Sequence, residues 1–312
     1  MINSDVLRVI LAKGAGDAVL RKMSYQIARG VPYSLSEICN NQQVMCSLGI
    51  KSDVAKNIYE SKEQALLLKE QLEKNCINMC WIGEEDYPIG IKKLSVGTIP
   101  AVLFYKGNYD LLKQKTVGFT GSRNVSDSGI RITDNSARQF SLDGITIVSG
   151  YAKGVDITAH KAALQTGGNT VFVIVEGLLK NKIKSEVKEL LNEKNHLFVS
   201  QFHPNLTWSA SNAMKRNNTI IGLSNAMILI ESGMTGGTFN AGEQSLKNRK
   251  PLFVVEYGIY KPSAEGNNFF LQNGGTPIRG DKNGMPILKR VYSAIENKEN
   301  NGIYEQMHLN IG

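Results

Sequence analysis

Two uninterrupted apolar runs, at residues 171–175 and 226–230, constrain the fold of this chain more than any other feature. A strand that exposes one face to water alternates apolar and polar residues, whereas these runs contain no polar position. Strands buried on both faces occur mainly in parallel sheets that are covered by helices on either side. The sequence therefore predicts an α/β fold with a mostly parallel sheet.

Strands and helices are expected to alternate regularly from residue 116 onward. Each expected strand is short and apolar, and small or polar residues separate it from the next helix. The expected strands lie at 101–107, 116–120, 145–148, 170–175, 196–200, 226–231 and 251–255. Helices are expected near 183–193, 209–222 and 238–247.

The first 75 residues or so have a different character, with apolar positions at helical spacing. Segment 53–73 is rich in Glu, Lys and Leu and lacks Gly and Pro, so we expect one long helix there. One more helix is expected after residue 287, followed by a loosely packed terminus. We therefore predict a small helical N-terminal domain at 1–78, an α/β domain at 79–286 and a C-terminal tail at 287–312.

Small and cationic residues follow three of the expected strands. The first turn contains Gly121, Ser122 and Arg123; the second contains Ser149, Gly150, Lys153, Gly154 and Asp156; the third contains Ser232, Gly236, Gly237 and Thr238. Small residues let backbone N–H groups approach an anion, and a helix N-terminus favours negative charge. Since the carboxyl ends of parallel strands share one edge, these turns predict a groove for a phosphate chain or a single nucleotide. The alternative is that the glycines only close tight turns.

A basic and amide-rich run precedes the strand at 226–231. It consists of Lys215, Arg216, Asn217 and Asn218. Such side chains can bind phosphates and base edges, although a solvated charged surface is the ordinary explanation. We expect Lys153 and Lys215 to border the same groove as Arg123.

Asp156 and His160 are four residues apart, so they share one face of the expected helix. Such a pair can act as acid and base, but an Asp near a helix start more commonly caps the helix. We expect His160 either to bond locally or to face a ligand.

Other features exclude several classes of function. The chain has no Gly-x-x-x-x-Gly-Lys-Ser/Thr motif, which argues against a Walker-type NTPase. The spacing of Gly118 and Gly121, with no acidic residue ending the second strand, argues against dinucleotide binding. The cysteines at 39, 46, 76 and 80 lack the spacing of a zinc finger, so neither a metal nor a cofactor is expected.

The balance of charged residues favours a polyanionic partner, because the formal net charge is +8. No apolar run approaches the roughly 18 residues that a membrane-spanning helix needs. The first residues do not form a signal peptide pattern, so a cytoplasmic location is expected.

From about residue 86 to residue 275 the chain resembles the DNA-processing protein A family, also called DprA or Smf. The resemblance rests on blocks that follow in the family's order and spacing, at 87–88, 100–108, 121–123, 149–160, 167–170, 216–217, 221–224, 231–233 and 266–274. The last block includes Asn268, which joins the expected contacts. Lys153 and Asn218 depart from the family, which usually has arginine at both positions.

The resemblance implies an extended Rossmann-like fold that binds single-stranded DNA without catalysing a reaction. It also implies a homodimer that protects incoming DNA and loads the RecA recombinase during natural transformation.

Two other functions are compatible with the same fold. Residues Gly236, Gly237 and Thr238 resemble a loop of the lysine-decarboxylase-like phosphoribohydrolases, which place a Glu three residues after the Thr. This chain has Ala241 there, and its nearest acid is Glu243. A diverged paralogue that senses a nucleotide or invading DNA in a defence system is the other alternative.

Overall fold

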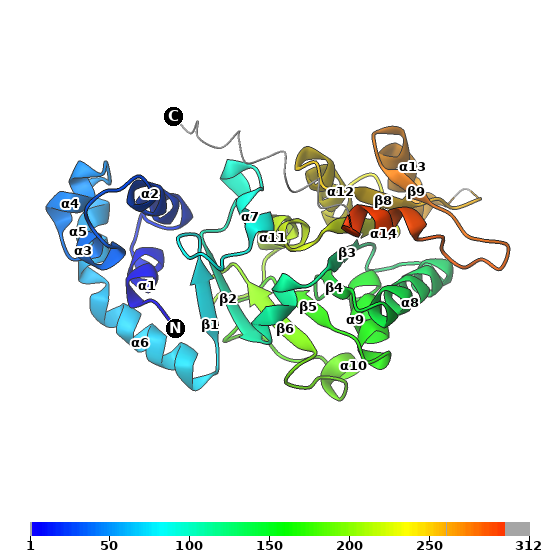
Figure 1. The fold of residues 1–312 in the computed structure, drawn as a ribbon, viewed down its shortest axis with the longest axis horizontal. Helices are drawn as coiled ribbons and strands as arrows, with labels where there is room; N and C mark the ends of the chain where they lie inside the picture. The colour runs from blue at the N-terminus through cyan, green and yellow to red at the C-terminus, as the bar shows by residue number, and fades with distance from the viewer. Residues whose placement is uncertain (1, 260, 297–312) are drawn as a thin grey trace.

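A single nine-stranded sheet forms the centre of the protein, whose computed structural model describes residues 2–259 and 261–296 (Figure 1). The strands are β1 (Asn78–Trp81), β2 (Val102–Gly107), β3 (Thr116–Thr120), β4 (Thr146–Ser149), β5 (Thr170–Val173), β6 (His196–Ser200), β7 (Ala226–Leu229), β8 (Leu252–Val255) and β9 (Thr276–Ile278). Their order across the sheet is β1-β2-β6-β5-β4-β3-β7-β8-β9. Only the β1–β2 and β2–β6 pairs are antiparallel in the described sheet.

Successive residues of the central strands enter hydrophobic cores on opposite faces of the sheet. In β7, Ala226 and Ile228 pack into one core, and Met227 and Leu229 pack into the other. The first core lies under α8 (Asp127–Leu142), α9 (Val155–Gln165) and α14 (Lys289–Glu296); the second lies under α7 (Ile89–Lys92), α11 (Ala210–Leu223), α12 (Gly237–Lys247) and α13 (Glu265–Gln272). This burial on both sides explains the uninterrupted apolar runs. The predicted α/β fold, with a mostly parallel sheet and helices on both faces, is confirmed.

The strand order reverses between β3 and β7. From β3 the chain continues through β4 and β5 to β6 on one side, and then returns to β7, β8 and β9 on the other. Connections that leave neighbouring strands toward opposite faces open a crevice at the carboxyl ends of those strands. Such a crevice is therefore expected beyond the ends of β3 and β7.

The N-terminal region is a bundle of short helices beside β1, at the left of Figure 1. These helices are α1 (Ser4–Leu11), α2 (Asp17–Ala28), α3 (Leu35–Cys39), α4 (Gln42–Ser47), α5 (Ser52–Glu60) and α6 (Lys62–Lys74). One hydrophobic cluster extends from Val6 and Ile58 in the bundle to Phe172 and Phe198 in the sheet. Because this cluster crosses residue 78, the division of the chain into domains there stays a prediction.

Two expected helices differ from the structure. Segment 53–73 forms α5 and α6, which meet at Ser61. The hydroxyl of Ser61 donates to the carbonyl oxygen of Asn57 at 2.7 Å, and a bond of this kind bends helices. Within 183–193 only α10 (Ser185–Lys188) is helical. There, the side chain of Asn192 accepts hydrogen bonds from backbone N–H groups of the following residues, which competes with helix formation.

The end of the described chain packs onto the sheet. Val291 and Ile295 of α14 are buried in the core under β3, β7 and β8. The expected loose terminus after this helix, at 297–312, lies outside the described residues. In the part of the chain that the structure describes, no helix has both the length and the apolar character needed to cross a membrane.

His160 joins α9 to the sheet. Its ring is fully buried, with Nε2 2.6 Å from the carbonyl oxygen of Gly150 and Nδ1 2.5 Å from the hydroxyl of Thr170. A carbonyl can only accept a hydrogen bond, so Nε2 carries the proton. Burial lowers the pKa of His160 to about 3, so the ring is neutral at pH 7.

We expect this histidine to make the fold sensitive to acid. The unfolded chain binds a proton at a pKa near 6.5 and the folded chain near 3, so stability falls as the pH drops through this interval. The free energy of unfolding should decrease by up to roughly 1.4 kcal/mol per pH unit from this group. Urea unfolding of wild type and His160→Gln at pH 7, 6 and 5 measures the difference in slope.

His203→Gln is the matched control, because this imidazole is only half-buried. Its substitution should change the slope less than His160→Gln does. Parallel pH profiles for wild type and His160→Gln would contradict the assignment.

Candidate functional site

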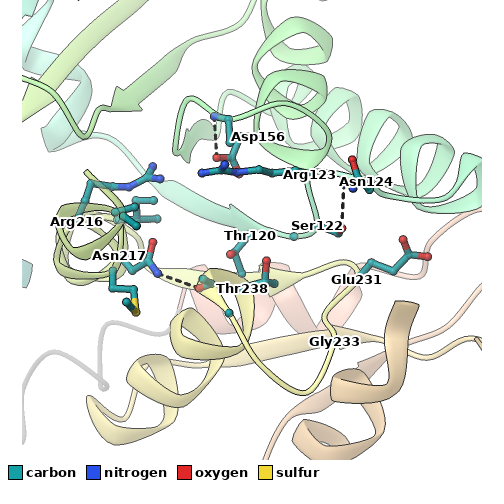
Figure 2. A pocket seen from close by; sticks show the side chains of 18 of the residues that line it. Thr120, Ser122, Arg123, Asn124, Asp156, Arg216, Asn217, Glu231, Gly233 and Thr238 are labelled. Atoms are coloured by element: carbon teal, nitrogen blue, oxygen red, sulfur yellow. Dashed lines mark hydrogen bonds between the residues drawn. The ribbon is translucent and has the colours of Figure 1, made fainter. Parts of the chain in front are cut away.

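A cavity of about 510 Å³ opens at the carboxyl ends of β3 and β7, where the strand order reverses (Figure 2). We call it the switch cleft. Its walls come from the loop after β3, the loop after β7 and the first half of α11. The predicted residues that line it are Gly121, Ser122, Arg123, Asp156, Arg216, Asn217, Gly236, Gly237 and Thr238. Parts of all three predicted turns and of the basic run therefore meet here.

The loops after β3 and β4 are in close backbone contact. Gly154 has a φ of +77°, and a Cβ atom at this position would collide with the carbonyl oxygens of Ser122 and Arg123. The backbone N–H of Ser122 in turn donates to the carbonyl oxygen of Glu231 at 2.9 Å. Glycine is required at 154 by both conformation and space, which holds the rim of the cleft in place.

Two helices begin near the cleft without a side-chain cap. The first residues of α9 and α12 follow Gly154 and Gly236, and neither helix has a capping side chain among residues 2–259 and 261–296. By contrast, Ser126 caps α8 through a bond from the N–H of Gly129. The start of α12 lines the cleft, so its free N–H groups and the helix dipole favour an anion there.

A buried arginine forms one wall of the cleft. Arg216 is only 7% exposed, and its Nη1 donates to the carbonyl oxygen of Val173 at 2.8 Å. Its Nε has no hydrogen-bond partner within the described residues. Burial lowers the pKa of Arg216, which the carboxylate of Asp156 counteracts. Since a buried donor without a partner is costly, this guanidinium is suited to donate a hydrogen bond to a ligand oxygen.

Asp156 stabilises the turn before α9. Its carboxylate accepts hydrogen bonds from the hydroxyl of Ser149 at 3.0 Å and from the N–H of Ala152 at 3.2 Å. Burial raises the pKa of Asp156, and the nearby guanidinium of Arg216 opposes this shift. A Cβ atom at Gly150 would overlap with both Arg216 and Asp156. These two side chains therefore occupy the space that a side chain at residue 150 would fill.

The remaining predicted residues do not line the switch cleft. They are Ser149, Gly150, Lys153, Gly154, His160, Lys215, Asn218, Ser232 and Asn268. Ser149, Gly150, Gly154 and His160 lie behind the wall, where they support the turn before α9.

Lys215 does not border the same groove as Arg123, contrary to the expectation. It is exposed on α11 and acts electrostatically on Asp17 at the start of α2. The neighbouring Arg216 and Asn217 line the cleft instead, because successive helical residues point about 100° apart.

Asn268 is exposed, whereas Asn267 makes the buried contacts of this block. The amide of Asn267 donates to the carbonyl oxygens of Ile230 and Val255 and accepts from the N–H of Ser232. Asn267 therefore holds the loop after β7, and the block has a structural role that the sequence alone did not reveal.

A second cavity of about 680 Å³ lies beside the first, and it contains Lys153. We call it the lysine cleft. The residues that characterise it were not among the predicted contacts; they are Tyr151, Lys180, Lys182, Lys184 and Trp208. The alternating lysines after the strand at 170–175 were the available signal, but the expected helix at 183–193 obscured it.

Trp208 is the exposed aromatic residue at the junction of the two clefts. Its side chain lines both cavities and is 53% exposed. The guanidinium carbon of Arg123 lies 5.9 Å from the centre of its ring. A cation and an open aromatic face are thus adjacent at this rim.

Within residues 2–259 and 261–296, no group of three or more His, Cys, Asp and Glu side chains is arranged to hold an ion.

Comparison with known proteins identifies the family. The profile of the family described as DNA recombination-mediator protein A matches residues 78–288, more than half of the chain. The DNA processing protein DprA of Streptococcus pneumoniae is 33% identical over 177 residues, which cover 56% of this chain and 62% of that protein. DprA of Bacillus subtilis is 27% identical over 249 residues, which cover 74% and 83%.

Solved structures agree with the sequence relatives. The X-ray structure of S. pneumoniae DprA superposes with a TM-score of 0.73 at 26% identity, over 89% of this chain and 95% of that one. A structure of DNA processing protein A from Helicobacter pylori shares the fold, with a TM-score of 0.56 at 23% identity, over 72% and 96%. The aligned sequence spans less than two thirds of the S. pneumoniae protein. The chain belongs to the DNA recombination-mediator protein A family, whose members are named DprA or Smf.

Proposed function

We propose that this protein binds single-stranded DNA in the switch cleft and catalyses no reaction on it. The observation that carries the proposal is that the Nε of the buried Arg216 has no partner among the described residues, which also provide no side-chain cap for the start of α12 in the same cleft. Both features supply donors for a phosphate oxygen. The H. pylori relative, which was described for its single-stranded DNA binding mode, supports the choice of ligand.

The proposed binding has little sequence preference. The donors that line the cleft include two guanidinium groups and the backbone N–H groups of glycines, which suit phosphates. Trp208 adds an aromatic surface on which any base can stack. Affinity carried by phosphates falls steeply as the salt concentration rises.

The absence of catalysis is part of the proposal. Glu231 lines the cleft, but its carboxylate accepts bonds from the N–H and hydroxyl of Ser126 and lies 3.7 Å from the ammonium of Lys261. Glu243 is exposed and is not among the lining residues. Incubation with AMP and CMP should release no free base by chromatography. Base release that disappears in Glu231→Gln would favour a phosphoribohydrolase instead.

The wider role that we propose is the loading of RecA onto incoming strands by a cytoplasmic homodimer during transformation. Family membership supports this role. Light scattering in solution tests the dimer, and RecA filament assembly on single strands, with and without the protein, tests the loading. A protein that binds DNA but leaves RecA assembly unchanged would favour the defence-system alternative.

Arg123→Ala should weaken the binding of an oligothymidine strand by about 1–3 kcal/mol and reduce the salt slope by about 0.7, the value for one phosphate on a single strand. The physical reason is the loss of a guanidinium that lines both clefts. Fluorescence anisotropy with a labelled strand at several salt concentrations measures both quantities. Lys215→Ala, which removes an exposed charge outside the clefts, is the control and should have little effect.

Failure of the wild-type protein to bind the strand at low salt would contradict the proposal. If a mononucleotide bound at micromolar concentration in the same preparation, a nucleotide sensor would become the better explanation.

Gly150→Ala should weaken strand binding about tenfold or more while the protein remains folded. The added methyl group needs the space that the side chains of Arg216 and Asp156 occupy, so it displaces the guanidinium from the wall. Anisotropy measures the affinity, and circular dichroism checks the fold. Gly97→Ala is the control, because a Cβ atom there meets nothing within 4 Å. Equal affinities for the two variants would mean that the position of Arg216 is unimportant.

A further inference from the structure

The two clefts differ sharply in charge. Arg123 and Arg216 are the cationic residues of the switch cleft, where the carboxylates of Asp156 and Glu231 balance them. The lysine cleft is lined by one carboxylate, that of Glu176, and by six cationic residues: Arg123, Lys153, Lys180, Lys182, Lys184 and Arg216. Most of the unbalanced positive charge around the site therefore lies in the lysine cleft.

Lys184 is fixed in the wall of this cleft. Its backbone N–H donates to the hydroxyl of Tyr151 at 2.7 Å, and its ammonium donates to the carbonyl oxygen of the same tyrosine. The ammonium also lies 4.5 Å from the centre of the tyrosine ring. Burial lowers the pKa of Lys184 and Arg123 adds to the shift, while nearby carboxylates oppose it. An anion in the cleft would stabilise this partly buried charge.

The wall that carries Lys184 is preformed rather than loose. The ring of Tyr151 makes edge-on contacts with Phe172 at 5.1 Å and with Phe198 at 5.7 Å between ring centres. Both phenylalanines belong to buried strands of the sheet. The loop is thus anchored to the core, and a ligand would not have to order it.

Lys180 and Lys182 present free charge at the mouth of the cleft. Both are exposed, and in the described part of the chain neither forms an ion pair with a carboxylate. Arg216, at the boundary of the two clefts, keeps an Nε without a partner among the described residues.

We propose that the lysine cleft is a second phosphate subsite, which holds one phosphate of a DNA strand while a neighbouring phosphate occupies the switch cleft. The inference rests on the proposed function and deepens it. Arg123, Trp208 and Arg216 line both clefts, so one strand can pass from one to the other without leaving the surface. The base between the two phosphates stacks on the exposed ring of Trp208.

The double variant Lys180→Gln/Lys182→Gln tests the subsite, because both side chains are exposed and their loss should leave the fold intact. Its control is Lys188→Gln/Lys194→Gln, which removes the same net charge from exposed positions outside the cleft. Anisotropy with oligothymidine strands at several salt concentrations, and competition by dTMP, give the affinities. For the cleft variant we expect affinity for the strand to fall about tenfold and the salt slope to fall by at least about 0.7, the value for one phosphate on a single strand.

The control variant should bind the strand like the wild type, and dTMP should bind both variants equally, since it has only one phosphate. Equal strand affinity in the cleft variant and the control would overturn the second subsite while leaving the proposed function intact. An equal loss for dTMP and for the strand in the cleft variant would also overturn it, because the lysines would then act on the first phosphate. Failure of the wild type to bind any strand would instead refute the proposed function.

Discussion

The position of the guanidinium of Arg216 is the constraint on which both clefts depend. Its bond to the carbonyl oxygen of Val173 ties α11 to the end of β5, and Asp156 approaches it from the first turn of α9. The two side chains meet over Gly150, which leaves room for them because it has no side chain. The consecutive elements α9 and β5 are thus held to the more distant α11 at one point. The wall between the switch cleft and the lysine cleft exists because they meet there.

The sheet could be predicted from the sequence because its strands carry a local signal. A strand covered on both faces must be apolar at every position, and β5 and β7 show this without any knowledge of their neighbours. The break at Ser61 has no comparable signal, since all of 53–73 has residues that favour a helix. Both helices contribute residues to one hydrophobic core, so the position of the break depends on the tertiary structure.

The sequence predicted which segments form the site better than it predicted which of their side chains point into the cleft. The small residues after β3 and β7 do line a cleft, since strand ends in a parallel sheet share one edge. Which residue of α11 enters the cleft depends on the rotation of the helix, so Arg216 and Lys215 could not be distinguished in advance. His160 has a polar side chain that supports the loops from behind, and a sequence pattern does not separate that role from ligand contact.

The protein has two tryptophans, and they lie in contrasting surroundings. Trp81 is 7% exposed within a hydrophobic cluster, while Trp208 is 53% exposed at the rim that both clefts share. The emission of an indole ring depends on its contact with water and with stacked rings. A ligand bound at this rim would therefore change the fluorescence of Trp208, whereas the fluorescence of the buried Trp81 would stay constant. The protein thus has an intrinsic fluorescent probe, Trp208, where the two clefts meet, and ligand binding there can be followed without an attached dye.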